Sequence, residues 1–198
     1  MTHRNLGHNG GPPFTRQSGW HLHCWKKARA NLIGPRMPIE TVRYRVKRAK
    51  ALGLSYPQYA SALLGTGRDI AAFLFTIDGL HLRLQRRLEM PDAVRTKLAA
   101  VEDCMLTAFS PYDEDPAEFR IELQDVSGVP FAAAVHQPHE MATWHEAKST
   151  VRSVLDQVHL PRDAVVMIGR GEIEKKWADA GSLAHFISAR TFFERSHP

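Results

Sequence analysis

The strongest constraint on the fold is an uninterrupted apolar segment in the last third of the chain. Residues 164–168 read Ala-Val-Val-Met-Ile, and Gly169-Arg170-Gly171 follows directly. A run of this length bounded by glycine is typical of a strand that is buried on both of its faces. The residues after it, over about 172–180, have the pattern of a helix. The chain is therefore expected to contain a strand-to-helix unit of an α/β layer fold.

The carboxyl-terminal half, residues 119–198, has the order β-β-α-β-α. Its expected strands cover 119–123, 130–135 and 164–168, and its expected helices cover about 140–158, 172–180 and 182–193. The first of these strands is predicted because Phe119, Ile121 and Leu123 alternate with polar residues.

The amino-terminal half is predicted to be rich in helices. Apolar residues recur at helical spacing over about 19–33, 38–52, 56–64 and 91–109. Residues 70–88 fit two structures. Their apolar residues suit a helix, but Asp78-Gly79 between two alternating stretches is a strong signal for a β-hairpin. We favour the hairpin, because a glycine inside a helix costs about 1 kcal/mol.

These segments predict an α+β protein with two parts. Residues 110–118 are acidic and contain two prolines, so they are the expected linker. The predicted organisation is a flexible arm over 1–17, a basic helical part over 18–109, the linker over 110–118, and a small acidic α/β part over 119–198.

Charge is distributed unevenly along the chain. The first 100 residues hold 17 lysines and arginines against 5 aspartates and glutamates, a net charge of +12, whereas the last 98 hold 9 against 16, a net charge of −7. This asymmetry indicates either that the basic part binds a polyanion or that the two halves attract each other within the fold. Both interpretations are compatible with the sequence.

The predicted helix over 38–52 is the most basic segment. Arg43, Lys47 and Lys50 fall on one flank of it, and phosphates or acidic side chains would neutralise them. The order of three helices and a hairpin also suits a winged helix-turn-helix, although the third helix contains no lysine or arginine. The expected nucleic-acid contacts are Arg36, Arg43, Lys47, Lys50, Arg68 and Arg83.

Histidines form two clusters that we consider as metal sites. His21, His23 and Cys24 lack the paired spacing of a zinc site. In the second cluster, His139-Glu140 is followed by the next histidine at the wrong helical spacing for a zinc protease. No metal is therefore expected, with His136 and His139 as weak candidates.

Other features narrow the function classes. The sequence has no apolar stretch of eighteen residues and no recognisable secretory leader, and its two cysteines cannot form a disulfide framework. A cytoplasmic protein without a cofactor is expected. Gly169-Arg170-Gly171 lacks the third glycine of a dinucleotide-binding loop, because position 174 is Glu, so we interpret it as a plain turn.

The predicted function is nucleic-acid binding in a regulatory role, through the basic helix and the hairpin. The acidic carboxyl-terminal part would then mediate self-association or contact another protein. The alternative is an adaptor whose basic face binds an acidic protein partner. A metal-dependent enzyme built on His136, His139 and Glu140 is the third interpretation. Whether the protein is an enzyme stays open, although the absence of the common catalytic motifs favours a non-enzyme.

Overall fold

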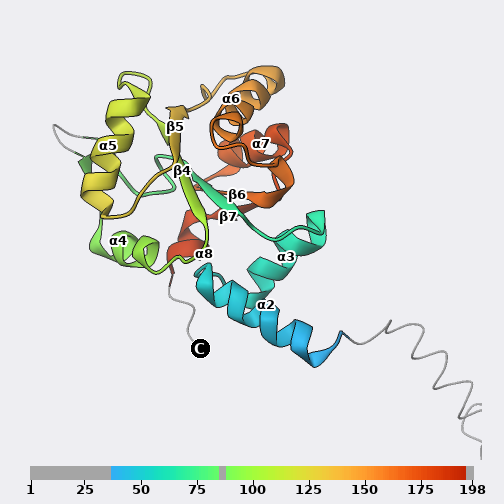
Figure 1. Cartoon of the computed structure of the whole chain (residues 1–198). Helices are drawn as coiled ribbons and strands as arrows, with labels where there is room; N and C mark the ends of the chain where they lie inside the picture. The colour runs from blue at the N-terminus through green and yellow to red at the C-terminus, as the bar shows by residue number, and fades with distance from the viewer. Residues whose placement is uncertain (1–36, 85–87, 195–198) are drawn as a thin grey trace, which may run out of the picture. The chain divides into compact units, whose positions relative to one another are not determined.

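The structure is a computed structural model that describes residues 37–84 and 88–194 (Figure 1). The chain divides into two compact units, residues 1–42 and residues 43–198. Only residues 37–42 of the first unit are described, whereas almost the whole of the second unit is.

A five-stranded parallel sheet forms the centre of the second unit. Its strands are β1 (Ala72–Phe75), β4 (Met105–Ser110), β5 (Ala133–His136), β6 (Val165–Gly169) and β7 (His185–Ser188). They lie in the order β5-β4-β1-β6-β7, and each neighbouring pair is parallel. The chain runs from the central β1 outward through β4 and β5, and then crosses to the other side of β1 for β6 and β7. The direction of the connections thus reverses between β1 and β6.

Helices cover both faces of this sheet (Figure 1). The helices are α2 (Ile39–Ala51), α3 (Tyr56–Thr66), α4 (Asp92–Ala99), α5 (Pro116–Ser127), α6 (Trp144–Gln157), α7 (Glu172–Gly181) and α8 (Ala189–Phe193), with a short 3-10 turn at Arg162–Ala164. Buried residues of α6 and α7 form the core on one face. Buried residues of α3, α4, α5 and α8 form the core on the other.

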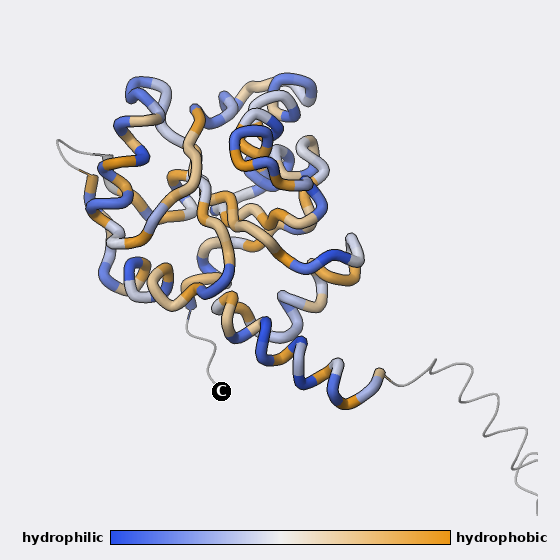
Figure 2. Tube along the Cα trace, viewed as in Figure 1, coloured by the Kyte–Doolittle hydropathy of each residue, from blue (hydrophilic) through white to orange (hydrophobic). Residues whose placement is uncertain are grey.

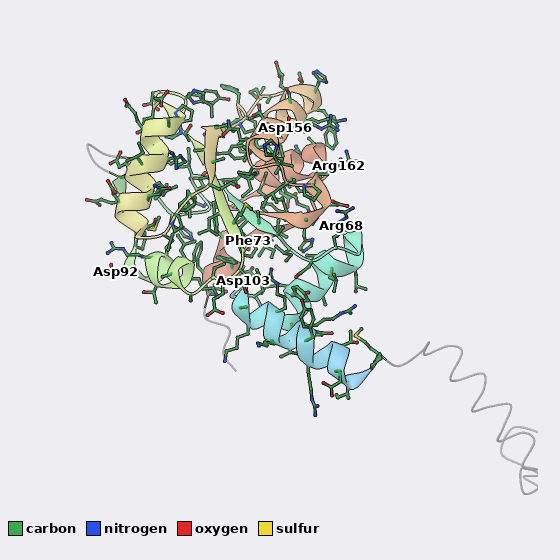
Figure 3. The ribbon with its side chains drawn as sticks, in the orientation of Figure 1. Arg68, Phe73, Asp92, Asp103, Asp156 and Arg162 are labelled. Atoms are coloured by element: carbon green, nitrogen blue, oxygen red, sulfur yellow. The ribbon has the colours of Figure 1, made fainter. Side chains whose placement is uncertain are left out.

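Successive residues of each inner strand belong to opposite cores, as the two-residue period of a strand requires. In β1, Phe73 and Phe75 pack on the α5 side and Leu74 packs on the α6 side. All three are fully buried. Apolar segments accordingly run through the middle of the unit (Figure 2). Phe73 lies in this region, whereas Asp92, Asp156 and Arg162 lie at the surface (Figure 3). This double burial explains why the strands are apolar without interruption.

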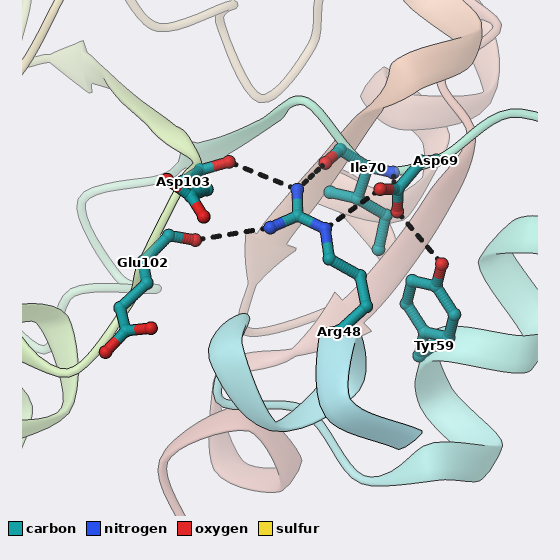
Figure 4. A network of polar contacts seen from close by, with 6 residues as sticks. All are labelled: Arg48, Tyr59, Asp69, Ile70, Glu102 and Asp103. Atoms are coloured by element: carbon teal, nitrogen blue, oxygen red, sulfur yellow. Dashed lines mark hydrogen bonds and ion pairs between the residues drawn. The ribbon is translucent and has the colours of Figure 1, made fainter. Parts of the chain in front are cut away.

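A polar network around Arg48 joins three segments that are distant in the sequence (Figure 4). Its guanidinium donates to the Asp69 carboxylate at 2.9 Å and to the Ile70 carbonyl at 2.9 Å. It also donates to the carbonyls of Glu102 and Asp103, at 3.4 and 3.1 Å. The Arg48 side chain is only 14% exposed. The second half of α2 is therefore tied to the approaches of both β1 and β4.

The expectation of a mixed α and β protein is confirmed, but the winged-helix arrangement is wrong. The hairpin expected over 70–88 is instead the central strand β1 followed by a turn at Asp78-Gly79. A small antiparallel pair does occur, between β2 (Arg83–Leu84) and β3 (Leu88–Glu89). Glycine is needed at position 79 because the turn packs closely against β6. A Cβ atom there would lie 2.3 Å from the Ile168 carbonyl oxygen of β6.

The helix expected over 91–109 is also wrong in its second half. Helix α4 ends at Ala99, and β4 begins at Met105. Residues 106–110 are all buried between the neighbouring strands and helices of the sheet. Burial on both faces selects a strand here, although the same apolar residues also suit a helical stripe.

The acidic segment over 110–118 joins two elements of one sheet unit and does not separate two domains. Strands from both sides of it, such as β1 and β6, are hydrogen-bonded to each other. The strand expected over 119–123 is part of α5. Asp115 caps this helix by accepting hydrogen bonds from the backbone N–H groups of Ala117 and Glu118, which is a standard helix start.

None of the described helices is long and apolar enough to cross a membrane.

Candidate active-edge pocket

The carboxyl ends of the parallel strands meet at one edge of the sheet. In open α/β sheets, ligands bind outside this edge at the point where the strand connections reverse direction. Here that point lies between β1 and β6. The residues that follow β1, β6 and its neighbour β7 are therefore the first place to look for a binding site.

The turn after β1 is held by its own backbone and by Thr76. The Thr76 hydroxyl accepts a hydrogen bond from the Gly79 N–H at 2.9 Å, and the Leu80 N–H donates to the Thr76 carbonyl at 3.0 Å. The turn leads to His81, an exposed residue with a φ of 53°. Left-handed backbone is uncommon for a residue with a side chain, so His81 is held in place by the turn that precedes it.

Hydrogen bonds to Glu174 connect this turn to the end of β6. One oxygen of its buried carboxylate accepts the hydroxyl hydrogen of Thr76. The other accepts the backbone N–H groups of Arg170 and Gly171, at 2.5 and 2.6 Å. Thr76 is only 1% exposed. The hydroxyl and the carboxylate are therefore engaged with the protein itself, and they position the backbone that carries Arg170.

The third contribution comes from α8, which begins directly after β7. Ser188 caps this helix by accepting the Thr191 N–H at 3.2 Å. Arg190 follows in the first turn, and its Nε atom donates to the Glu194 carboxylate at 2.6 Å. This hydrogen bond, together with the negative charge of Glu194, raises the pKa of Arg190 further above neutrality.

These residues surround a pocket with a volume of about 560 Å³. The lining consists of His81, Arg170, Arg190, Phe193 and Glu194. The His81 and Phe193 rings are in edge-to-face contact, with centroids 5.8 Å apart. The pocket thus has an aromatic wall and two guanidinium groups.

The charge of the pocket favours an anion. Two arginines outweigh one glutamate in the lining when His81 is neutral. Among the described residues, the exposed Arg170 side chain has no hydrogen-bond or ion-pair partner of its own. Arg190 donates to Glu194 through Nε only. Its two terminal nitrogens have no hydrogen-bond partner within the described part of the chain.

The two histidines considered as metal ligands lie at the other end of the same edge, where His136 ends β5 and His139 follows it. His136 Nδ1 lies 2.9 Å from the Pro111 carbonyl oxygen, to which it must donate. His139 Nδ1 accepts the Met141 N–H at 3.1 Å. Within residues 37–84 and 88–194, no three histidine, cysteine or acidic side chains are grouped to hold a metal ion. The cluster of His21, His23 and Cys24 lies outside the described residues.

The residues expected to contact nucleic acid lie in different environments in the structure. Arg43, Lys47 and Lys50 are exposed on α2. Arg68 forms an ion pair with Asp163, at 2.9 Å. Arg36 and the side chain of Arg83 lie outside the described part of the structure.

The comparisons with known proteins give a similarity to a solved structure. No family model and no curated protein matches the chain. The chain is similar to the cobalt-bound form of the deoxy-D-mannose-octulosonate 8-phosphate phosphatase from Haemophilus influenzae. The similarity covers 61% of this chain and 68% of that one, with 13% identity and a TM-score of 0.39. A similarity of this strength does not transfer an activity.

The predicted function, a nucleic-acid-binding regulator with a winged helix, is wrong. The supposed wing contains β1, the central strand of a parallel sheet, so its residues cannot form a separate DNA-binding hairpin. An acidic protein partner is not tested by these findings and stays a prediction.

The sequence interpretation missed the residues that line the pocket. His81, Arg170 and Arg190 are far apart in the chain, and none belongs to a known motif. One local signal was present, because Arg170 stands between two glycines at the end of the apolar strand over 164–168. The sequence alone indicated a plain turn there, because Glu174 stands where a dinucleotide-binding loop has its third glycine. In the structure Glu174 is turned inward and held by Thr76, and Arg170 is left exposed.

Proposed function

We propose that the protein binds a small organic anion, a phosphate or a carboxylate, in the pocket at the carboxyl ends of β1, β6 and β7. The observation that supports this most strongly is the convergence of Arg170 and Arg190 on one pocket beside the reversal point of the sheet. Each arginine follows its strand within two residues, so both are held by the sheet itself.

The chemistry of the two arginines suits an oxyanion. A guanidinium presents several N–H donors in a plane and can donate two parallel hydrogen bonds to a phosphate or a carboxylate. Arg170 contributes its whole guanidinium and Arg190 its two terminal nitrogens. Glu194 orients Arg190 through the hydrogen bond that it accepts from Nε.

The aromatic wall suits an organic group attached to the anion. Phe193 is half-buried and packs against Phe192, with ring centroids 4.9 Å apart, and against His81. A planar or apolar substituent would cover these rings and lose contact with water. We therefore expect phenyl phosphate to bind more tightly than inorganic phosphate.

Binding can be measured by titrating the protein with phenyl phosphate, benzoate and inorganic phosphate and following amide chemical shifts by NMR. Loss of one charged hydrogen-bonding group costs about 1.5 to 3 kcal/mol, so Arg170→Ala should weaken phenyl phosphate binding about tenfold or more. The ratio between phenyl phosphate and benzoate then identifies the preferred oxyanion.

Arg162→Ala is the matched control. Arg162 precedes β6 and Arg170 follows it, so the two changes remove the same charge at opposite ends of one strand. Arg162→Ala should leave binding within about twofold. Equal weakening by both variants would show that net charge alone attracts the anion, and no binding at millimolar concentrations would refute the proposal.

A further inference from the structure

A second pocket lies at the same edge of the sheet, after β4 and β5. It has a volume of about 340 Å³ and is lined by Tyr112, Pro138, His139, Met141, Ala142, Glu146 and Thr150. Unlike the first pocket, this pocket has no lysine or arginine in its lining. Its lining does contain one acidic residue. Its charge is therefore opposite to that of the anion pocket.

The aromatic part of this pocket is held in a defined position. Tyr112 is 53% exposed, and its ring lies nearly parallel to the His136 ring, at an angle of 10° and a centroid distance of 6.1 Å. His136 is fixed in turn by its hydrogen bond to the Pro111 carbonyl. The His139 ring lies 6.0 Å from Tyr112 on a tilted plane. The three rings together form an aromatic cluster, of which Tyr112 and His139 line the pocket.

The carboxylate of Glu146 provides the negative charge. Its Oε2 atom accepts hydrogen bonds from the backbone N–H and the hydroxyl of Thr143, at 2.7 and 2.8 Å. These two bonds lower the pKa of Glu146, so the group is ionised at neutral pH. Oε1 has no partner among the described residues. Burial raises the pKa of Tyr112, and the charge of Glu146 raises it further, as a negative potential in the pocket requires.

Helix α6 does not reverse this potential. Glu146 lies in the first turn of α6 and Thr150 lies one turn further along on the same side. The full negative charge of the Glu146 carboxylate exceeds the partial positive charge of the helix amino terminus, which is about half an elementary charge. Met141 adds a polarisable thioether that is 85% exposed. The pocket therefore combines an aromatic face, a thioether and an ionised carboxylate.

We propose that this second pocket binds a small organic cation, with the ammonium group placed on the Tyr112 ring and beside the Glu146 carboxylate. A cation near an aromatic face is attracted by the electron density of the ring. An ionised carboxylate close to that ring adds a direct charge interaction. The proposal does not depend on the anion pocket, which uses different residues and the opposite charge.

Choline is the probe for the first test, and neohexanol, its uncharged carbon isostere, is the comparison. We expect the choline N-methyl resonance and the Tyr112 ring resonances to shift on titration, with choline binding at least about fivefold more tightly than neohexanol. Equal affinity for the two compounds would mean a merely apolar pocket and would overturn the proposal. No shift at tens of millimolar choline would overturn it as well.

Three variants separate the interactions. Tyr112→Phe keeps the ring and should bind choline within about twofold, whereas Tyr112→Leu should lose about fivefold or more. Glu146→Gln removes the charge but keeps a side chain that can complete the helix cap with Thr143, and it should also lose about fivefold. Unchanged binding by Tyr112→Leu would contradict the proposed placement.

Two controls keep the result specific. Tyr44→Leu removes an exposed tyrosine from α2 and should leave choline binding unchanged. Arg170→Ala should also leave it unchanged while weakening phenyl phosphate, so failure of one pocket is distinguishable from failure of the other. Loss of choline binding in Arg170→Ala would mean that the two pockets are one site, which would overturn this assignment.

Discussion

The thiol of Cys104 lies at the start of β4 beside the Arg48 network. Burial raises its pKa to about 12, and the nearby positive charge of Arg48 only partly opposes this effect. Since the thiolate is the reactive form of cysteine, the folded protein holds this side chain almost entirely as an unreactive thiol. The sequence shows only that the residue is present, and its reactivity depends on the fold.

Alkylation of Cys104 should therefore be slow in the native protein. At pH 8 we expect iodoacetamide to modify it at least about a hundredfold more slowly than in the urea-unfolded chain, because the thiolate fraction falls with the raised pKa. Mass spectrometry of the peptide that contains Cys104 measures this rate, and the Cys24 peptide from the urea sample provides a reference for an unfolded thiol. Equal rates in the native and unfolded chains would contradict the buried environment.

At the scale of the elements, the pair of Thr76 and Glu174 joins the turn after β1 to the start of α7. The hydroxyl donates to one carboxylate oxygen, and two backbone N–H groups occupy the other. Gly79 and Gly169 allow this close contact, because a Cβ atom at Gly169 would lie 3.0 Å from the Glu174 Cβ atom. The pair thus positions both His81 and Arg170 for the anion pocket.

Thr76→Val should destabilise the protein more than its small change in shape suggests. Valine leaves a Glu174 oxygen and the Gly79 N–H without their partner, and each unsatisfied buried group costs about 1 to 3 kcal/mol. We expect the free energy of unfolding to fall by about 2 to 4 kcal/mol in urea titrations. Thr76→Ser keeps the hydroxyl and should lose only about 1 kcal/mol. A similar loss in both variants would assign the effect to packing.

Several helices and one strand were predicted correctly from the sequence. Helices α2, α3, α6 and α7 and strand β6 were expected close to their observed bounds. Each is determined by neighbouring residues, through a helical apolar stripe, a cap such as Thr143, or an uninterrupted apolar run. Helix α5 was mistaken for a strand because Phe119, Ile121 and Leu123 alternate, although Asp115-Pro116 was a local sign of a helix start.

At the scale of the whole second unit, Arg48 connects α2 to the loops that lead into β1 and β4. Asp69 receives Arg48 on one oxygen and the Tyr59 hydroxyl and Ile70 N–H on the other, at 3.0 and 2.8 Å. Burial and the hydrogen bond to Asp69 raise the pKa of Tyr59 to about 12. A basic residue on the basic helix thus serves the fold and not an external polyanion.

Arg48→Met should lower the free energy of unfolding by about 2 to 3 kcal/mol, because it removes a charged group that donates four hydrogen bonds. Lys47→Met changes the adjacent exposed residue by the same charge and should stay within about 0.5 kcal/mol of the wild type. Urea unfolding followed by circular dichroism measures both. Equal effects of the two variants would show that net charge, and not the network, accounts for the change.

The elements of this protein that can be predicted from its sequence are those whose signals are local. The apolar run at 164–168 and the helical stripes are short-range patterns, and backbone geometry converts them into structure without reference to the rest of the chain. Only the tertiary structure decided that residues 105–110 form a strand, because burial between two helical layers selects it. The anion pocket is likewise tertiary. His81, Arg170 and Arg190 meet because parallel strands bring their carboxyl ends to one edge, whatever their separation along the chain.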